Sequence, residues 1–322
     1  MADMIRWGVL STANIGRNRV IPAIQQSSNG RVTAVASRTL EKARAFADET
    51  NIPTAYGSYE EMIASPDIDA IYIPVPNSEH AQWSIRCAEA GKPTLCEKPL
   101  ASNAAEAQKM VDAFKARGVL FAEAFMYRFH PQTERVKQMI NDGAVGEIRA
   151  MQSTFNFVAR NEDDIRLNKA LVGGSLMDVG CYCINVMRLM LDSEPSEAHA
   201  LSRIGATSQV DESLSAVMAF PNGVLGHFDS SLRSYFAHTY EIRGTHGRIS
   251  VEQGFVMPKD SETLVRYWHG DQYEEIYIPP ANSYTLMAED FAAALIDGRP
   301  PRFAPEDGVA NMRVIDLLNA SV

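Results

Sequence analysis

Between residues 5 and 125, short apolar runs alternate with segments in which apolar residues recur every three or four positions. We expect the apolar runs to be β-strands and the periodic segments to be amphipathic helices. The predicted strands are IRWGVL (5–10), RVTAVAS (31–37), DAIYIPV (69–75), TLCEKP (94–99) and VLFAEAF (119–125). The predicted helices cover 40–49, 58–65, 80–91 and 103–118. Repeated β–α units of this length predict a doubly wound parallel sheet.

The ends of these helices carry capping signals. Ser58 and Asn103 are each followed three residues later by a glutamate, which is typical of helix N-caps. Gly91 and Gly118 stand where helix C-caps belong.

After about residue 125 the pattern changes to alternating strands joined by tight turns. A helix over 131–143 precedes a long strand over 147–157, and hairpins are predicted at Asn222-Gly223, at Thr245-His246 and at Gly270. We therefore predict two domains, 1–125 and 126–322, the second an α+β domain with a large, mainly antiparallel sheet. If helices cover only one face of that sheet, the open face is free for a partner subunit. We expect a homodimer or homotetramer formed through it.

Composition excludes several classes of function. The chain of 322 residues has a formal net charge of −10 and no basic block, which argues against a nucleic-acid partner. The start of the sequence lacks the pattern of a signal peptide, and no apolar run approaches the roughly 20 residues of a membrane span. We expect a cytoplasmic protein with no membrane partner. Cys181-x-Cys183 is a conceivable metal ligand pair, but buried, inert thiols are favoured and no metal site is predicted.

The stretch VLSTANIG (9–16) lies where dinucleotide-binding folds carry G-x-G-x-x-G. Ser11 and Ala13 are small enough to let the backbone approach a pyrophosphate, and Gly16 keeps the residue that packs the helix closely on the strand. The loop also ends at a helix N-terminus, which favours phosphate. We predict a cofactor loop formed by Ser11, Thr12, Ala13, Asn14 and Ile15. The alternative is an ordinary β–α turn.

The end of the second predicted strand indicates which dinucleotide binds. NAD-specific folds place a carboxylate there for the ribose hydroxyls. This chain has Ser37 and Arg38 instead, with Lys42 one helical turn later. Because a guanidinium grips a phosphate in bidentate fashion, these residues favour NADP over NAD. The alternative is that Arg38 is a solvated residue at the start of a helix.

Two further motifs, CEKPLA (96–101) and GGSLMDVGCYCIN (173–185), resemble those of the glucose-fructose oxidoreductase/inositol dehydrogenase (Gfo/Idh/MocA) family. The resemblance covers essentially the whole chain. Within the family, the chain resembles the sugar-oxidising branch, which contains glucose-fructose oxidoreductase, D-xylose 1-dehydrogenase and dimeric dihydrodiol dehydrogenase. The residues that carry this closer resemblance are EAFMYRFHP (123–131) and Tyr182. The resemblance to the family implies a Rossmann domain followed by an α+β domain, with the nicotinamide at their junction.

The resemblance also implies catalytic roles. Lys98 matches the lysine of E-K-P, where an ammonium can hydrogen-bond the reacting oxygen. Asp178 and Tyr182 match the D-x-x-x-[HY] pattern, and their spacing places them on one face of a helix. The ordinary tyrosine pKa, about 10, is too high for a base at neutral pH, so a cation such as Lys98 has to lower it. We assign Tyr182 as general acid/base and Asp178 as orienting group. The alternative for Tyr182 is a core aromatic.

Further residues are assigned by position. Pro76, Asn77, His80 and Glu97 resemble the family's cofactor-side residues, although His80 is equally typical of a structural hydrogen-bonding residue. Tyr127 and Arg128, with His130, line the predicted domain junction or pack inside it. The substrate side is predicted to include Tyr127, Arg128, Arg166, Asn168, Lys169 and Asp178, because sugar hydroxyls need donors and acceptors. The alternative for 160–174 is a solvated loop.

We therefore predict an NADP(H)-dependent oxidoreductase that acts on a pyranose or related cyclic polyol, most simply an aldose 1-dehydrogenase. Alternatives of the same class are a reductase of a keto- or anhydro-sugar and a dihydrodiol dehydrogenase. The alternative of another class is a non-catalytic NADP-binding regulator, for which Lys98, Asp178 and Tyr182 have no evident use.

Overall fold

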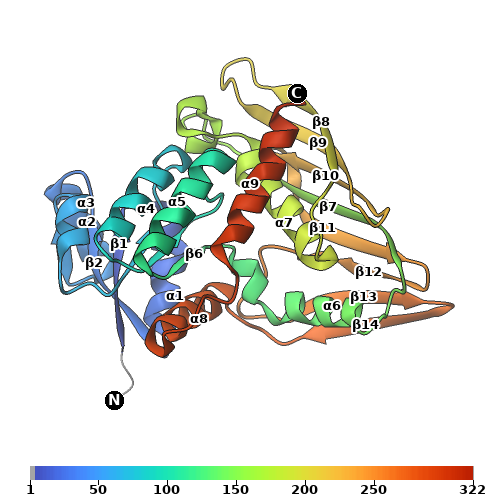
Figure 1. Ribbon diagram of the computed structural model, residues 1–322, viewed down its shortest axis with the longest axis horizontal. Helices are drawn as coiled ribbons and strands as arrows, with labels where there is room; N and C mark the ends of the chain where they lie inside the picture. Colours follow the sequence, from blue (N-terminus) through green and yellow to red (C-terminus); the bar gives the residue numbers. More distant parts are fainter. Residues whose placement is uncertain (1–3, 322) are drawn as a thin grey trace. The chain divides into compact units, whose positions relative to one another are not determined.

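The structure, a computed structural model, describes residues 4–321 (Figure 1). The chain divides into two compact units. Unit 1 runs to Met126 and also takes in Tyr284–Val309, whereas unit 2 comprises Tyr127–Ser283 and the rest of the chain from Ala310. The first boundary lies one residue from the predicted one. The prediction differs for Tyr284–Val309, which it assigned to the second domain.

Unit 1 is built on a six-stranded sheet in the order β3-β2-β1-β4-β5-β6, in which every pair is parallel. This is the strand order of doubly wound dinucleotide-binding folds. The strands are β1 (Ile5–Leu10), β2 (Gly30–Ala36), β3 (Thr54–Tyr56), β4 (Ala70–Ile73), β5 (Thr94–Cys96) and β6 (Phe121–Glu123). The helices among them are η1 (Gly16–Val20), α1 (Ile21–Gln26), α2 (Leu40–Thr50), α3 (Tyr59–Ala64), η2 (Asn77–Glu79), α4 (His80–Glu89) and α5 (Ala104–Arg117). The short strand β3 was not predicted.

The predicted helix caps are confirmed. The Ser58 side chain accepts a hydrogen bond from the Glu61 amide at 3.2 Å, and Asn103 accepts one from the Glu106 amide at 2.9 Å. Gly118 ends α5 with a φ of +62°, a conformation that glycine adopts without strain.

The helix α8 (Ser283–Asp297) explains why a late segment belongs to unit 1. The Phe291 ring packs against Trp7 of β1 at a centroid distance of 5.2 Å. Glu289 accepts hydrogen bonds from the backbone amide and hydroxyl of Ser28 at 2.7 and 2.9 Å. Figure 1 shows α8 beside α1, at the start of the chain. These contacts join segments that no local sequence pattern connects.

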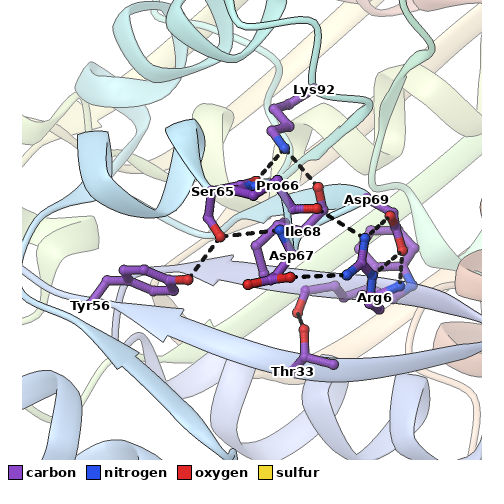
Figure 2. Close-up of polar contacts among 10 residues, drawn as sticks. Arg6, Thr33, Tyr56, Ser65, Pro66, Asp67, Ile68, Asp69 and Lys92 are labelled. Carbon is purple, nitrogen blue, oxygen red and sulfur yellow. Dashed lines mark hydrogen bonds and ion pairs between the residues drawn. The ribbon is translucent and has the colours of Figure 1, made fainter.

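The amino ends of the unit 1 strands are tied together by a polar cluster (Figure 2). Arg6, in β1, donates to both carboxylate oxygens of Asp69 at 2.9 and 2.8 Å. Lys92 donates to the carbonyls of Ser65 and Ile68 at 2.6 and 2.8 Å. Since ligands of such sheets bind at the carboxyl ends of the strands, this cluster serves stability.

Unit 2 is built on an eight-stranded sheet in the order β14-β13-β12-β11-β7-β10-β9-β8. All neighbours are antiparallel except β7 and β10, which are parallel. The strands are β7 (Ile148–Val158), β8 (Glu197–Ile204), β9 (Asp211–Ala219), β10 (Leu225–Ser231), β11 (Arg233–Gly244), β12 (Gly247–Val251), β13 (Thr263–His269) and β14 (Gln272–Ile278). Its helices are α6 (Pro131–Asn141), η4 (Ile165–Leu167), η5 (Lys169–Leu171), η6 (Leu176–Gly180) and α7 (Cys181–Leu191), while α9 (Pro305–Asn319) spans the boundary between Val309 and Ala310.

One face of this sheet is open. The helix α7 packs on β7 and β10, and α6 packs on β13. On the opposite face, Leu201, Val217 and Leu225 of three neighbouring strands are 83%, 57% and 61% exposed. The predicted fold class, a doubly wound parallel sheet plus an open-faced and mainly antiparallel sheet, is confirmed.

One helical run, Lys169–Leu191, is long and apolar enough to cross a membrane by length and composition alone. The sequence prediction overlooked this run. Because 72% of its apolar window is buried inside the protein, it matches the core helix of a globular domain.

Candidate active site

In the turn after β1, Ser11 adopts a backbone conformation that usually requires glycine. Ser11 has a φ of +137°, a region that costs a non-glycine residue on the order of 1–3 kcal/mol. Its hydroxyl donates to the Pro74 carbonyl at 3.1 Å and accepts from the Ala13 amide at 3.3 Å. These hydrogen bonds offset part of the strain, so the serine preserves the tight turn that the first glycine of the motif usually makes.

The other loop residues lead directly into a helix, because the Ala13 carbonyl accepts from the Arg17 amide at 3.1 Å. The first amides of this helix are donors that suit a pyrophosphate. The predicted packing role of Gly16 was wrong: a Cβ there would lie 3.7–3.8 Å from its nearest neighbours, an ordinary contact. The protein's own packing therefore does not require a glycine at this position.

The end of β2 suits a phosphate group. Thr39 caps α2 by accepting from the Lys42 amide at 3.4 Å, so the helix N-terminus lies beside Arg38. Arg38 and Lys42 have exposed side chains, whereas Ser37 is only 5% exposed and its amide donates to the Tyr56 carbonyl. Of the three predicted residues, Arg38 and Lys42 are the two that present cationic groups to solvent.

His80, for which the sequence left a cofactor-side role and a structural role open, is held by hydrogen-bonding neighbours in the backbone. It follows Pro76 and Asn77 at the start of α4, and its ring is fully buried. Its two ring nitrogens lie 2.9 Å from the Pro99 carbonyl and 3.0 Å from the Val75 carbonyl. Burial lowers the pKa of His80 to about 4, so the ring is neutral at neutral pH. The ring thus contacts the backbone of the segment after Lys98, as the structural alternative for His80 describes. A cofactor contact of this residue stays a prediction.

Glu97 and Lys98 follow β5, at the carboxyl edge of the sheet. Glu97 is 8% exposed and accepts a hydrogen bond from the Tyr72 hydroxyl at 2.6 Å. Its second oxygen accepts from the Lys98 amide at 3.2 Å. The Glu97 carboxylate thus fixes the backbone that carries the candidate catalytic lysine. Burial raises the pKa of the Tyr72 hydroxyl well above its ordinary value, so it remains a donor.

In unit 2, Asp178 and Tyr182 lie on one continuous helix. Asp178 belongs to the π-helical segment η6, and Tyr182 to the first turn of α7. Their spacing of four residues predicted this placement. Short π-helical segments inside α-helices are frequent at functional sites.

Two glycines precede this helix because atoms of unit 2 approach them closely. A Cβ on Gly173 would lie 2.3 Å from the Arg166 carbonyl oxygen. Gly174 has a φ of +116°, and a Cβ there would lie 2.0 Å from a carboxylate oxygen of Asp211. The Gly-Gly pair of the motif therefore lets the substrate-side loop and a buried carboxylate meet at the start of the helix.

Asp211, at the start of β9, anchors the helix that carries Asp178 and Tyr182. Its Oδ2 accepts hydrogen bonds from the Ser175 hydroxyl and the Leu176 amide, both at 2.7 Å. Burial raises the pKa of its carboxyl above the ordinary value. Sequence analysis missed this residue, because the anchor comes from a distant strand and has no local signal.

We expect Asp211→Ala to lower the free energy of unfolding by about 1–3 kcal/mol, because it leaves the Leu176 amide at the helix start without its acceptor, whereas the Ser175 hydroxyl keeps the Ser230 carbonyl at 3.2 Å. Asp211→Asn, which keeps an acceptor oxygen, is expected to lose less than half as much. Urea unfolding of the two variants measures this difference. Equal losses in both would contradict the anchoring role.

Arg166 and Asp178 form an ion pair. Arg166 Nε donates to Asp178 Oδ2 at 2.7 Å, and the same guanidinium contacts Asp164 at 3.2 Å. The Asp178 side chain is 13% exposed. The two carboxylates raise the pKa of the Arg166 guanidinium above its ordinary value, and Asp178 has the larger effect. The structure thus brings together two predicted substrate-side residues and gives Asp178 a cationic partner that sequence analysis did not predict.

The Tyr182 ring is packed among aromatic side chains. Its centroid lies 5.3 Å from Phe155, 5.5 Å from Phe255 and 5.8 Å from Tyr127. The residue is 6% exposed. These neighbours hold the ring in one orientation, as a proton-transferring phenol requires.

Tyr127 is packed inside unit 2. It is fully buried, and its hydroxyl donates to the Asn185 side chain of α7 at 2.6 Å. Arg128 is 4% exposed, and His130 is fully buried and caps α6 by accepting from the Gln132 amide. The side chains of Tyr127 and His130 thus support α7 and α6. The substrate contacts of Tyr127 and Arg128 stay a prediction.

The remaining loop residues differ from one another. Asn168 accepts a hydrogen bond from the Ala170 amide at 2.9 Å and so caps the short helix η5. Lys169 has an exposed side chain. Asn168 therefore serves as a helix cap, whereas the Lys169 side chain does not.

Metal ligation finds no support within residues 4–321, where no three His, Cys, Asp or Glu side chains gather. Cys181 and Cys183 are both buried free thiols. Burial also raises the pKa of Cys87 to about 12. These thiols are packing groups rather than ligands or nucleophiles.

With this geometry established, the chain can be compared with known proteins. Residues 5–125 match the oxidoreductase family with an NAD-binding Rossmann fold, and residues 133–250 match the GFO/IDH/MocA C-terminal domain. The sequence is 39% identical over 317 residues to D-xylose 1-dehydrogenase (NADP(+)) 2 of Haloferax volcanii, covering 98% of this chain and 96% of the relative. It is 32% identical over 326 residues to trans-1,2-dihydrobenzene-1,2-diol dehydrogenase of Bos taurus, covering 99% and 93% of the two chains.

The fold is also that of a solved enzyme. A 3-ketoreductase from Actinomadura kijaniata, in complex with NADP and TDP-benzene, superposes with a TM-score of 0.93. The two proteins are 30% identical, and the match covers 99% of this chain and 98% of that chain. Together with the matches over both units, this likeness shows that the chain is a member of the Gfo/Idh/MocA family of oxidoreductases.

Proposed function

We propose that this protein is an NADP(H)-dependent oxidoreductase that acts on a pyranose sugar or a related cyclic polyol, most simply as an aldose 1-dehydrogenase. The observation that carries the proposal is the helix on which Asp178, paired with Arg166, precedes the ring-packed Tyr182. The 39% sequence identity to an NADP-linked D-xylose 1-dehydrogenase supports the substrate class.

The cofactor supplies the hydride acceptor or donor when it is bound. The residues that would hold it are those around Ser11 for the pyrophosphate, and Arg38 with Lys42 for a 2′-phosphate. Ser11 keeps the tight turn, and the exposed cations at the start of α2 match the charge of the phosphate.

The chain's own residues handle the proton. In the oxidising direction, Tyr182 acts in its deprotonated form, and its phenolate oxygen takes the proton of the reacting sugar hydroxyl to become a hydroxyl again. Lys98 donates a hydrogen bond to the same sugar oxygen and stabilises its developing charge. Asp178 holds the Arg166 guanidinium, a donor suited to a neighbouring hydroxyl of the sugar.

Other relatives support a second candidate, reduction of a keto-sugar or oxidation of a dihydrodiol. A panel of aldoses, inositols, keto-sugars and diols with NADP(H) and NAD(H), followed at the nicotinamide absorbance, distinguishes these activities. Aldose oxidation with NADP is the expected result. If the protein binds NADP and turns over none of these compounds, the non-catalytic regulator is favoured instead.

Cofactor choice is tested by Arg38→Ala, which removes a charge-assisted contact of roughly 1.5–3 kcal/mol and is expected to weaken NADP about ten- to a hundredfold. NAD binding should barely change. Arg44→Ala, an equal change of charge at an exposed position within α2, is the control. Quenching of protein fluorescence measures both affinities. Equal affinity of the unaltered protein for NAD and NADP would overturn this assignment.

We also propose that the open face of the unit 2 sheet forms a homo-oligomer. Exposed Leu201, Val217 and Leu225 are apolar groups that a second copy would bury. Light scattering at micromolar concentration is expected to give a dimer or tetramer. Val217→Asp should dissociate it, because the substitution buries a charge in that interface. A monomeric unaltered protein would refute the proposal.

A further inference from the structure

The strand β11 contains an irregularity beside the candidate site. Its pairing with β7 shifts between Arg233 and Ala237, so the residues between them leave the regular ladder. Two of these residues are aromatic and exposed, Tyr235 at 91% and Phe236 at 51%. Bulges of this kind re-aim side chains and are frequent next to active sites.

The bulge is tied to the substrate-side loop by Arg233. Its guanidinium donates to the Ala159 carbonyl at 3.0 Å and to both carboxylate oxygens of Glu162 at 2.9 Å. It also donates to Glu212 at 2.9 Å. The loop that carries Arg166 and the bulge are therefore held by one side chain.

His238 follows the bulge and has one preset donor. Its Nδ1 accepts hydrogen bonds from the amides of Phe255 and Val256, both at 3.3 Å, so the proton lies on Nε2. Burial lowers the pKa of His238 to about 4, so the ring is neutral at neutral pH. The residue is 6% exposed, and Nε2 makes no hydrogen bond within the described residues.

A chain of ring contacts connects this histidine with the candidate acid/base. His238 lies 4.9 Å from Phe236 and 5.9 Å from Phe155, measured between ring centroids. Phe155 in turn lies 5.3 Å from Tyr182. His238 pairs with Phe155 across β11 and β7, so both point to the sheet face on which α7 packs.

We propose that Phe236 and His238 form a sugar-binding subsite of the active site, an inference that rests on the proposed function. A pyranose has hydroxyls around its rim and C–H groups on its faces. The Phe236 ring provides an apolar surface for one face, and the His238 Nε2–H donates to a rim hydroxyl. A few fixed donors beside aromatic surface are the usual composition of a small-molecule site.

The test compares substitutions at the two positions. His238→Leu removes the donor and is expected to raise KM for the best sugar about tenfold, whereas His238→Gln, which keeps an N–H at a similar reach, should stay near the unaltered value. Phe236→Ala should raise KM several-fold, and Phe236→Tyr should not. The control is Tyr235→Ala, because Tyr235 is more exposed and makes no ring contact within the described residues.

Four measurements separate the possible outcomes: NADP affinity, thermal unfolding, KM and oligomer mass. Fluorescence titration should give the unaltered NADP affinity in all five variants, and thermal unfolding shows whether each is folded. Should His238→Leu fail to fold, Phe236→Ala alone decides. Unchanged KM in both variants, with sugar turnover intact, overturns the subsite and leaves the proposed function standing. If Phe236→Ala changes the mass of the oligomer but leaves KM unchanged, the Phe236 ring belongs to a subunit contact and not to the sugar subsite. Absence of turnover by the unaltered protein removes the proposed function and this inference together.

Discussion

Lys98→Met is expected to lower kcat by on the order of 10²–10⁴-fold or more, the largest effect expected of any single substitution in this protein. In the proposed mechanism, the change removes the hydrogen bond to the reacting sugar oxygen and also the cation that lowers the pKa of Tyr182. NADP affinity should change much less, because the residues proposed to hold the pyrophosphate and the 2′-phosphate lie elsewhere in unit 1. Steady-state turnover of the best sugar is the measurement.

The chain offers a matched control for this substitution. Lys92 of the same unit donates to two backbone carbonyls at the amino edge of the sheet (Figure 2). Lys92→Met should lower the free energy of unfolding by about 1–3 kcal/mol while kcat stays unchanged. If both variants lose activity in proportion to their stability, the catalytic assignment of Lys98 fails.

The second large effect is expected of Tyr182→Phe, which should lower kcat about 10²–10⁴-fold. Phenylalanine keeps the ring contacts with Phe155 and Phe255 and removes only the hydroxyl, so the fold and NADP affinity should survive. Combined with Lys98→Met, the loss should be far from additive, because the proposed mechanism gives both residues a part in the same proton-transfer step. Near-normal kcat from pH 6 to pH 9 would show that the ring only packs.

Tyr127→Phe is the control for the tyrosine. It removes a hydroxyl from the same aromatic cluster, but that hydroxyl donates to Asn185 inside unit 2. We expect a loss of stability of about 1–3 kcal/mol with little change in kcat. The two substitutions therefore separate loss of chemistry from loss of packing.

The sequence by itself determined most strands and helices of unit 1, the hairpins of unit 2 and the class of both sheets. Alternating β–α units, the N-caps at Ser58 and Asn103 and the Asn222-Gly223 turn are local signals, and the backbone obeys them because propensity, capping and periodicity act within a few residues. The four-residue spacing of Asp178 and Tyr182 placed both on one helix for the same reason.

Only the tertiary structure decided which side chains meet. It paired Arg166 with Asp178, brought Asp211 to the start of the helix that carries Asp178 and Tyr182, and placed Tyr284–Val309 with unit 1. It also buried His80 and Tyr127, whose residue types suit either a binding site or a core. Each outcome depends on contacts between distant segments, and no local pattern records which strand or helix will become a residue's neighbour. Burial and partner, which set the pKa and the reach of a side chain, are therefore properties of the folded chain.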